Sequence, residues 1–154
     1  MKNNSGFTIM ELLTAIAIVG IMSAIAVPNM ITWRNNMQFN SAVRTVKISI
    51  ERARMAAIRA NMPSRIDFNV GGDSFDVIRW DMVANAFAAP VTVQLPPGTI
   101  LAGSNFAGNQ LRFNGNGMPV TLFGGTLRIE NSTGSLCSRI VVANLGSSRI
   151  EVCP

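Results

Sequence analysis

Apolar residues dominate the chain from residue 7 to residue 33 and set the first expectation for its structure. Glu11 is the only charged residue in this segment, and the stretch from Leu12 to Val27 contains none. As a helix, residues 7–33 would extend about 40 Å, which exceeds the roughly 30 Å hydrocarbon core of a bilayer. No small-residue cleavage site follows the segment. The pattern therefore predicts a retained helix that can span a membrane, after a short polar leader of residues 1–6.

Residues 34–60 continue the helical pattern but present only one apolar face. Apolar residues recur there at steps of three and four, which is the spacing of a helix with one buried side. The helix should end before Pro63, because the residue that precedes a proline avoids the helical region. The residues expected on the buried face are Phe39, Val43, Val46, Ile50, Ala53 and Ala57.

Beyond Pro63 apolar residues alternate with polar ones, which is the period of β-strands. Glycine pairs at Gly71-Gly72 and Gly124-Gly125 separate strands, and we expect them to supply the positive φ angles of turns. A long helix followed only by strands predicts an α+β fold, in which an antiparallel β-sheet packs on the apolar face of the helix. The expected strands are 65–70, 74–80, 91–95, 111–113, 120–123, 126–130, 139–143 and 149–152, with a loop or short helical turn at 83–90 and a loop at 105–109.

The composition of the chain narrows the chemistry that it can carry out. Its 13 Lys and Arg against 8 Asp and Glu give a formal charge of +5, which a solvated surface explains as well as a polyanionic partner does. The chain has no histidine, and it lacks a nucleophile elbow, a phosphate-binding glycine loop and the spacing of metal ligands. We therefore expect a protein that is not an enzyme and holds neither a metal nor a cofactor.

Cys137 and Cys153 are the only cysteines of the chain. Two thiols alone make a poor zinc site. In an exported domain they would form one disulfide, closing a loop of about 15 residues that contributes ~3 kcal/mol in the chain-entropy model. Two free thiols are the alternative.

The single carboxylate near the start of the apolar segment needs an explanation. A lone charge at membrane depth costs at least ~2.5–3.5 kcal/mol, so it persists only where a partner compensates it. Cleavage between Gly6 and Phe7 would create a positive α-amino group on Phe7. That group could pair with the Glu11 carboxylate of a neighbouring copy.

This stretch resembles the class III signal of type IV prepilins and of the pseudopilins of type II secretion. Gly6, Phe7, Thr8 and Glu11 match its pattern of a basic leader, Gly, then Phe-Thr-x-x-Glu and an apolar helix. The resemblance implies that a prepilin peptidase cleaves after Gly6 and methylates Phe7, and that Thr8 and Glu11 serve assembly. It also implies a kink or local melting of the helix at Pro28. An ordinary signal anchor with an incidental glutamate is the alternative.

The C-terminal half resembles the minor pseudopilin family named GspH/FimT. Phe113 and Gly117 fit its Phe-x-x-x-Gly turn, and Gly146 with Arg149 fits its closing Gly-Arg strand loosely, because Ser147-Ser148 intervene. The resemblance implies a structural subunit of a type IV pilus or of a type II secretion pseudopilus, with other pilins or pseudopilins and an inner-membrane assembly platform as partners. We expect a leader (1–6), an anchor half (7–33) and an amphipathic half (34–60) of one helix, and a β-rich domain (61–154).

The same resemblance places the protein in the bacterial inner membrane as a single-pass protein with a periplasmic C-terminal domain, and then in the filament. Some members of the group take part in DNA uptake through basic residues near the C-terminal hairpin. Arg139 and Arg149 lie in that region, with Arg112 and Arg128 on earlier strands. A DNA-binding minor pilin for natural transformation is therefore the alternative function, and ordinary solvated strand faces are the simpler explanation of these arginines.

Overall fold

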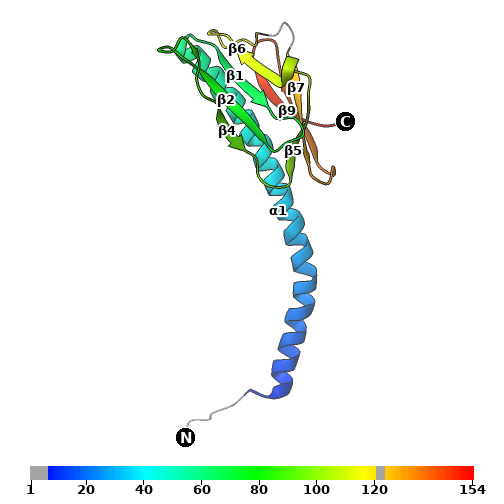
Figure 1. Cartoon of the computed structure of the whole chain (residues 1–154). Helices are drawn as coiled ribbons and strands as arrows, with labels where there is room; N and C mark the ends of the chain where they lie inside the picture. Colours follow the sequence, from blue (N-terminus) through cyan, green and yellow to red (C-terminus); the bar gives the residue numbers. More distant parts are fainter. Residues whose placement is uncertain (1–6, 121–123) are drawn as a thin grey trace. The chain divides into compact units, whose positions relative to one another are not determined.

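The computed structural model describes residues 7–120 and 124–154 of the chain, and these residues form two units that divide between Asn36 and Met37 (Figure 1). Helix α1 (Ile9–Ala60) contributes its first part to one unit and its second part to the other. The remaining elements all belong to the second unit.

The bounds of α1 agree closely with the helix that the sequence predicts. The helix continues through Pro28, which has no N–H to donate, and the side-chain amide of Asn29 donates to the Ile25 carbonyl at 3.3 Å. At the other end Asn61 has a positive φ of 49°. Its N–H donates to the Ile58 carbonyl, while the N–H of Met62 donates to the Ala57 carbonyl. This pair of bonds is the Schellman arrangement that terminates helices.

Five antiparallel strands form the first sheet, in the order β3-β2-β1-β6, with β4 also paired to β2. The predicted hairpin over 65–80 is confirmed as the β1–β2 pair. The prediction of a loop or helical turn at 83–90 is wrong in part, because two of its residues add a short strand to the edge of β2. The strands are β1 (Ser64–Phe68), β2 (Ser74–Asp81), β3 (Ala86–Phe87), β4 (Val91–Gln94) and β6 (Gln110–Phe113).

Four antiparallel strands form the second sheet, in the order β5-β7-β8-β9. The last predicted hairpin is confirmed as β8–β9, whereas β5 was not expected from the sequence. A 3₁₀ turn, η1 (Ala107–Asn109), lies in the loop expected at 105–109, and the strand expected at 120–123 falls mostly outside the described residues. The strands are β5 (Thr99–Ser104), β7 (Gly125–Asn131), β8 (Cys137–Val142) and β9 (Ser148–Val152).

The core of the second unit lies where the apolar face of α1 meets both sheets. All six residues predicted for the buried face of the helix are buried, and Ala42 joins them. The sequence predicted one sheet on this face, and the described residues form two. One buried polar contact ties helix to sheet, because the Ser64 hydroxyl donates to the Ala53 carbonyl at 2.9 Å. The largest fully buried strand residues are Ile66, Phe75, Leu101, Leu111, Phe113, Leu127, Ile129, Ile140 and Val142.

The glycine pair Gly124-Gly125 has a different role from the one that the sequence suggests. Gly71 does have a positive φ of 88°, but Gly72, Gly124 and Gly125 do not. A Cβ on Gly125 would collide with the ring of Phe106, which is buried and stacks on Phe68 with ring centroids 5.8 Å apart. The expectation of positive φ is therefore wrong at this pair, and the constraint at Gly125 is the space that an aromatic ring occupies.

We expect Gly125→Ala to lower the free energy of unfolding by about 1–3 kcal/mol, because the added methyl group displaces the Phe106 ring from a packed site. Gly103→Ala on β5 is the matched control, since a Cβ there meets nothing within 4 Å. The control should change the free energy of unfolding by less than about 0.5 kcal/mol. Urea unfolding of the full chain in detergent measures both, and equal effects would contradict the steric explanation.

Candidate functional site

The first candidate site lies at the start of α1. The backbone N–H of Glu11 donates to the Thr8 hydroxyl at 3.2 Å, so Thr8 caps the helix and Glu11 stands three residues after it. This is the spacing of a capping box, in which a serine or threonine is followed by Glu or Gln at the third helical position. Within residues 7–120 and 124–154, no side chain donates to the Glu11 carboxylate, and the Phe7 side chain is 82% exposed. The Thr8–Glu11 spacing was visible in the sequence, but its capping role was not anticipated.

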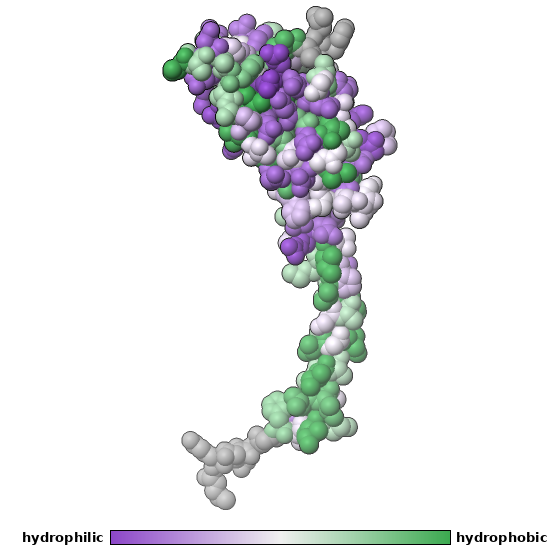
Figure 2. Space-filling view, viewed as in Figure 1, coloured by the Kyte–Doolittle hydropathy of each residue, from purple (hydrophilic) through white to green (hydrophobic). Residues whose placement is uncertain are grey.

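The helix that follows carries an apolar surface with nothing packed on it in the first unit. Its other polar side chains are bonded within the helix: the Ser23 hydroxyl donates to the Val19 carbonyl at 2.7 Å and the Thr14 hydroxyl to the Met10 carbonyl at 3.0 Å. Among the described residues, α1 is the one helix whose length and apolar composition would allow it to cross a membrane. Figure 2 shows these apolar side chains in green. Those that are exposed are Ile9, Met10, Leu12, Leu13, Ile16, Ile18, Val19, Ile21, Met22, Ile25, Val27, Met30, Ile31 and Trp33.

The second candidate site is the C-terminal hairpin. Arg139 on β8 and Arg149 on β9 both bind Glu151, with Nε-to-carboxylate distances of 2.9 Å and 2.6 Å. The hydrogen bond from Arg149, and then that from Arg139, holds the pKa of Glu151 below its usual range. Because the pKa of Glu151 is lowered in the folded state, these bonds stabilise the folded chain at neutral pH. Their contribution disappears as the pH falls through the lowered pKa and the carboxylate is protonated.

The other two arginines named with this hairpin are engaged as well. Arg128 lies opposite Arg139 in the sheet register and pairs with Glu130. Arg112 lies on the other sheet, where its guanidinium sits 5.4 Å from the centre of the Phe87 ring. The structure thus brings three of the four arginines onto one sheet face, but it places carboxylates among them. Glu151 was not singled out from the sequence, since only the strand register brings it beside Arg139.

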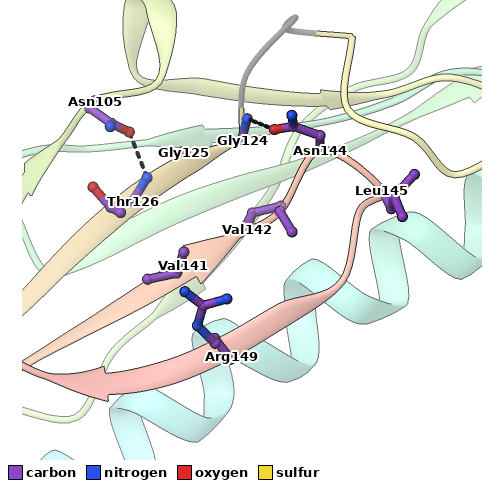
Figure 3. A pocket seen from close by; sticks show the side chains of 10 residues that line it. Asn105, Gly124, Gly125, Thr126, Val141, Val142, Asn144, Leu145 and Arg149 are labelled. Carbon is purple, nitrogen blue, oxygen red and sulfur yellow. Dashed lines mark hydrogen bonds between the residues drawn. The ribbon is translucent and has the colours of Figure 1, made fainter.

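A hollow of about 610 Å³ lies beside Arg149 (Figure 3). Its two asparagine side chains are already paired, because the amide oxygen of Asn105 accepts from the Thr126 N–H and that of Asn144 from the Gly124 N–H, both at 2.5 Å. The rest of the lining is mainly aliphatic side chains and glycine. Among the described residues that line this hollow, the one charged side chain is that of Arg149, which already binds Glu151.

The two cysteines form a disulfide, as expected. Cys137 at the start of β8 bonds to Cys153 just after β9, with the Cα atoms 5.5 Å apart. The bridge therefore fastens β9, the last strand of the second sheet, to β8.

In the described part of the chain, no three Cys, Asp or Glu residues come close enough to hold a metal ion.

Comparison with known families identifies the second unit. The model of a family described as type II transport protein GspH matches residues 42–146, well over half of the chain. The chain belongs to the GspH family. A further family model, the prokaryotic N-terminal methylation motif, matches residues 1–27.

Solved structures share the fold of this GspH-family chain. The type IV minor pilin FimU of Pseudomonas aeruginosa aligns with a TM-score of 0.60 and 19% identity, over 80% of this chain and 92% of that one. The minor pseudopilin EpsH from the type 2 secretion system of Vibrio cholerae aligns with a TM-score of 0.61 and 12% identity, over 75% and 97%. Comparison with curated proteins gives no match.

These matches decide the class of protein. The GspH-family chain belongs to a family of type II transport proteins, the pseudopilins, and it carries a prepilin processing motif. It belongs to a family of structural subunits and is not an enzyme. The methylation motif implies processing by prepilin peptidase and assembly with pseudopilins, and the apolar helix implies anchoring in the inner membrane before assembly.

We expect Arg149→Ala to raise the pKa of Glu151 more than Arg139→Ala does, because the bond from Arg149 contributes most to the lowering. NMR titration of the Glu151 carboxyl group measures the change. Arg65→Ala is the control, since Arg65 pairs with Asp67 on the other sheet and should leave Glu151 unaffected. The reverse order of the two arginines would contradict the assignment.

Proposed function

We propose that this chain is cleaved after Gly6, is methylated on Phe7 and enters a filament through the apolar half of its helix. Residues 1–6 act as the leader, residues 7–33 as the anchor and assembly segment, and residues 34–60 as the helix of the β-rich domain. The observation that carries the proposal is the exposed apolar surface of residues 9–33 with one carboxylate, Glu11, near its start. Such a surface is stable in a lipid bilayer or against other subunits, but not in water.

Glu11 supplies the specificity of assembly in this proposal. Its carboxylate pairs with the α-amino group of Phe7 in a neighbouring subunit, so that neither charge remains alone in an apolar environment. Among the described residues no side chain binds that carboxylate, and the Thr8 hydroxyl accepts from the backbone N–H of Glu11 at the first turn. Thr8 thus fixes the position from which Glu11 reaches the neighbouring subunit.

The proposal also assigns a cellular compartment to each part of the chain. The anchor first spans the inner membrane as a single pass, with residues 37–154 in the periplasm, and an inner-membrane assembly platform then moves the subunit into the filament. The Cys137–Cys153 disulfide supports a periplasmic location, because disulfides persist in that oxidising compartment. The filament is a type IV pilus or a type II secretion pseudopilus. Deleting the gene separates them, since loss of pili indicates the first and loss of protein export the second.

DNA binding by Arg139 and Arg149 stays a prediction. Both side chains bind Glu151, which offsets part of the charge that phosphate groups would need. DNA binding is therefore the second candidate function, after the structural role in a filament.

We expect Glu11→Gln to reduce incorporation of the chain into sheared filaments by about tenfold or more, equivalent to ~1.4 kcal/mol of assembly free energy. Glutamine still suits a capping box but has no charge, so this variant separates pairing from capping. Immunoblots of filament and membrane fractions measure incorporation. Thr8→Ala is the matched control: it removes the cap, keeps the charge and should have the smaller effect. Normal incorporation of Glu11→Gln would refute the pairing.

We expect mass spectrometry of the mature protein to find methylated Phe7 as its first residue. The bond between Gly6 and Phe7 is the predicted cleavage site, and Gly6→Val should block cleavage by adding a branched side chain beside it. The precursor would then accumulate in the membrane fraction. Filaments that contain an uncleaved chain starting at Met1 would refute this step.

A further inference from the structure

An exposed row of residues on the second part of α1 alternates between apolar and basic side chains. Ile48, Arg52, Met55 and Arg59 follow one another at steps of four, three and four, so they lie along one face of the helix. This row is distinct from the buried face, because Ile48 is 48% and Met55 46% exposed. Two large apolar side chains are thus presented to solvent in alternation with two guanidinium groups.

Strand β2 adds a third arginine to this row. Arg79 lies opposite Ser64 in the sheet register, and the Ser64 hydroxyl bonds to the helix at Ala53, so this position faces α1. A hollow of about 500 Å³ is lined by Arg52, Arg59 and Arg79 together, with Lys47, Ile48 and Met55 among its other residues. We call this hollow and its two neighbours the arginine groove.

The two neighbouring hollows extend the groove along the same helix. One of about 320 Å³ shares Arg52 and Arg79 and is lined by valines of β2 and β4. Another of about 330 Å³ shares Arg59 and Arg79 and lies near the end of α1. The three hollows therefore form a continuous surface in which arginines alternate with apolar patches.

The net charge of the groove is positive within the described residues. Its four cations, Lys47, Arg52, Arg59 and Arg79, face one carboxylate, that of Glu51, which accepts a hydrogen bond from Ser148 at 2.5 Å. In residues 7–120 and 124–154, none of the four cations lies within ion-pair distance of a carboxylate. The arginines of the second sheet, by contrast, are paired.

We propose that the arginine groove is the docking site for an acidic amphipathic helix of another subunit. Arg52 and Arg59 are seven residues apart, or about 10 Å along α1, so carboxylates at the same spacing on a neighbouring helix would reach both. Apolar side chains of the same neighbouring helix would cover Met55 between the two arginines and Ile48 one turn before them. This inference rests on the proposed function only in making the partner a subunit of the same filament.

Charge complementarity selects this partner over two others. A second copy of the chain, with its formal charge of +5, would bring like charge to the groove. Nucleic acid would satisfy the arginines but leave Ile48 and Met55 exposed. Trp80, which lines the third hollow, packs edge-on against Phe87 with ring centroids 5.1 Å apart, so one aromatic contact of this ring is already taken up within the chain.

The test measures peptide binding to the full-length chain in lipid nanodiscs. The probe is a fluorescent helical peptide with Glu and Leu at heptad positions, and its control has Gln in place of every Glu. Fluorescence anisotropy should show binding of the Glu peptide, with the Gln peptide at least threefold weaker. Duplex DNA of mixed sequence is the third ligand.

Variants locate the binding site. Arg52→Gln with Arg59→Gln should weaken binding of the Glu peptide about threefold to tenfold, the range expected from two exposed ion pairs. Arg34→Gln with Arg128→Gln loses the same charge outside the groove and should bind as the wild type does. All four side chains are exposed, so unchanged thermal unfolding checks that each variant folds.

Three results would overturn the proposal: no binding of the Glu peptide, equal loss in both double variants, or DNA binding that is tighter and is lost in the groove variant. The outcome is independent of processing and of the Glu11 pairing. Arg52→Gln with Arg59→Gln should still be cleaved at Gly6, whereas a failure of the proposed function would appear as uncleaved or unassembled wild-type chain. The two hypotheses can therefore fail separately.

Discussion

The structure depends on one helix whose two parts must bury apolar surface in different ways. From Met37 onward, one apolar face of the helix is covered by both sheets, while Ile48 and Met55 stay exposed outside it. Before Asn36, apolar residues surround the helix and no part of the first unit covers them. The hydrophobic effect therefore requires an external partner for the first part, either lipid or other subunits. In that environment a carboxylate such as Glu11 is costly and needs an opposite charge.

The sequence could predict the helix, its buried face and most strands, because each depends on local periodicity. The α1 residues Phe39 to Ala57 follow a helical period, and β1 and β2 alternate clearly. Strand β5 could not be predicted in this way, since Ile100 and Leu101 are adjacent apolar residues and a bulge between Leu101 and Gly103 interrupts its pairing. The reason for Gly125 was equally hidden, because the ring of Phe106 meets it only after the chain has folded.

The candidate sites also differ in whether the sequence alone could identify them. Gly6, Phe7, Thr8 and Glu11 are consecutive or nearly so, and a sequence pattern could therefore identify them. Ion pairing of the C-terminal arginines required the strand register, which places Glu151 beside Arg139. The arginine groove required tertiary structure, because it joins one arginine of β2 to two from the helix. Interactions between elements that are distant in sequence thus decided which arginines are paired and which are available.

The uneven placement of charge gives the chain two different surfaces. On the second sheet, Glu130 and Glu151 offset Arg128, Arg139 and Arg149, which suits a surface that remains in water. Along the helix and β2, the cations lie among exposed apolar side chains and outnumber the nearby carboxylate. Apolar contact supplies affinity without choosing a partner, whereas the sign of a charge discriminates between partners. In a subunit whose apolar helix and Glu11 can pair with any neighbour of the same kind, the arginine groove adds a charged surface that discriminates between neighbours.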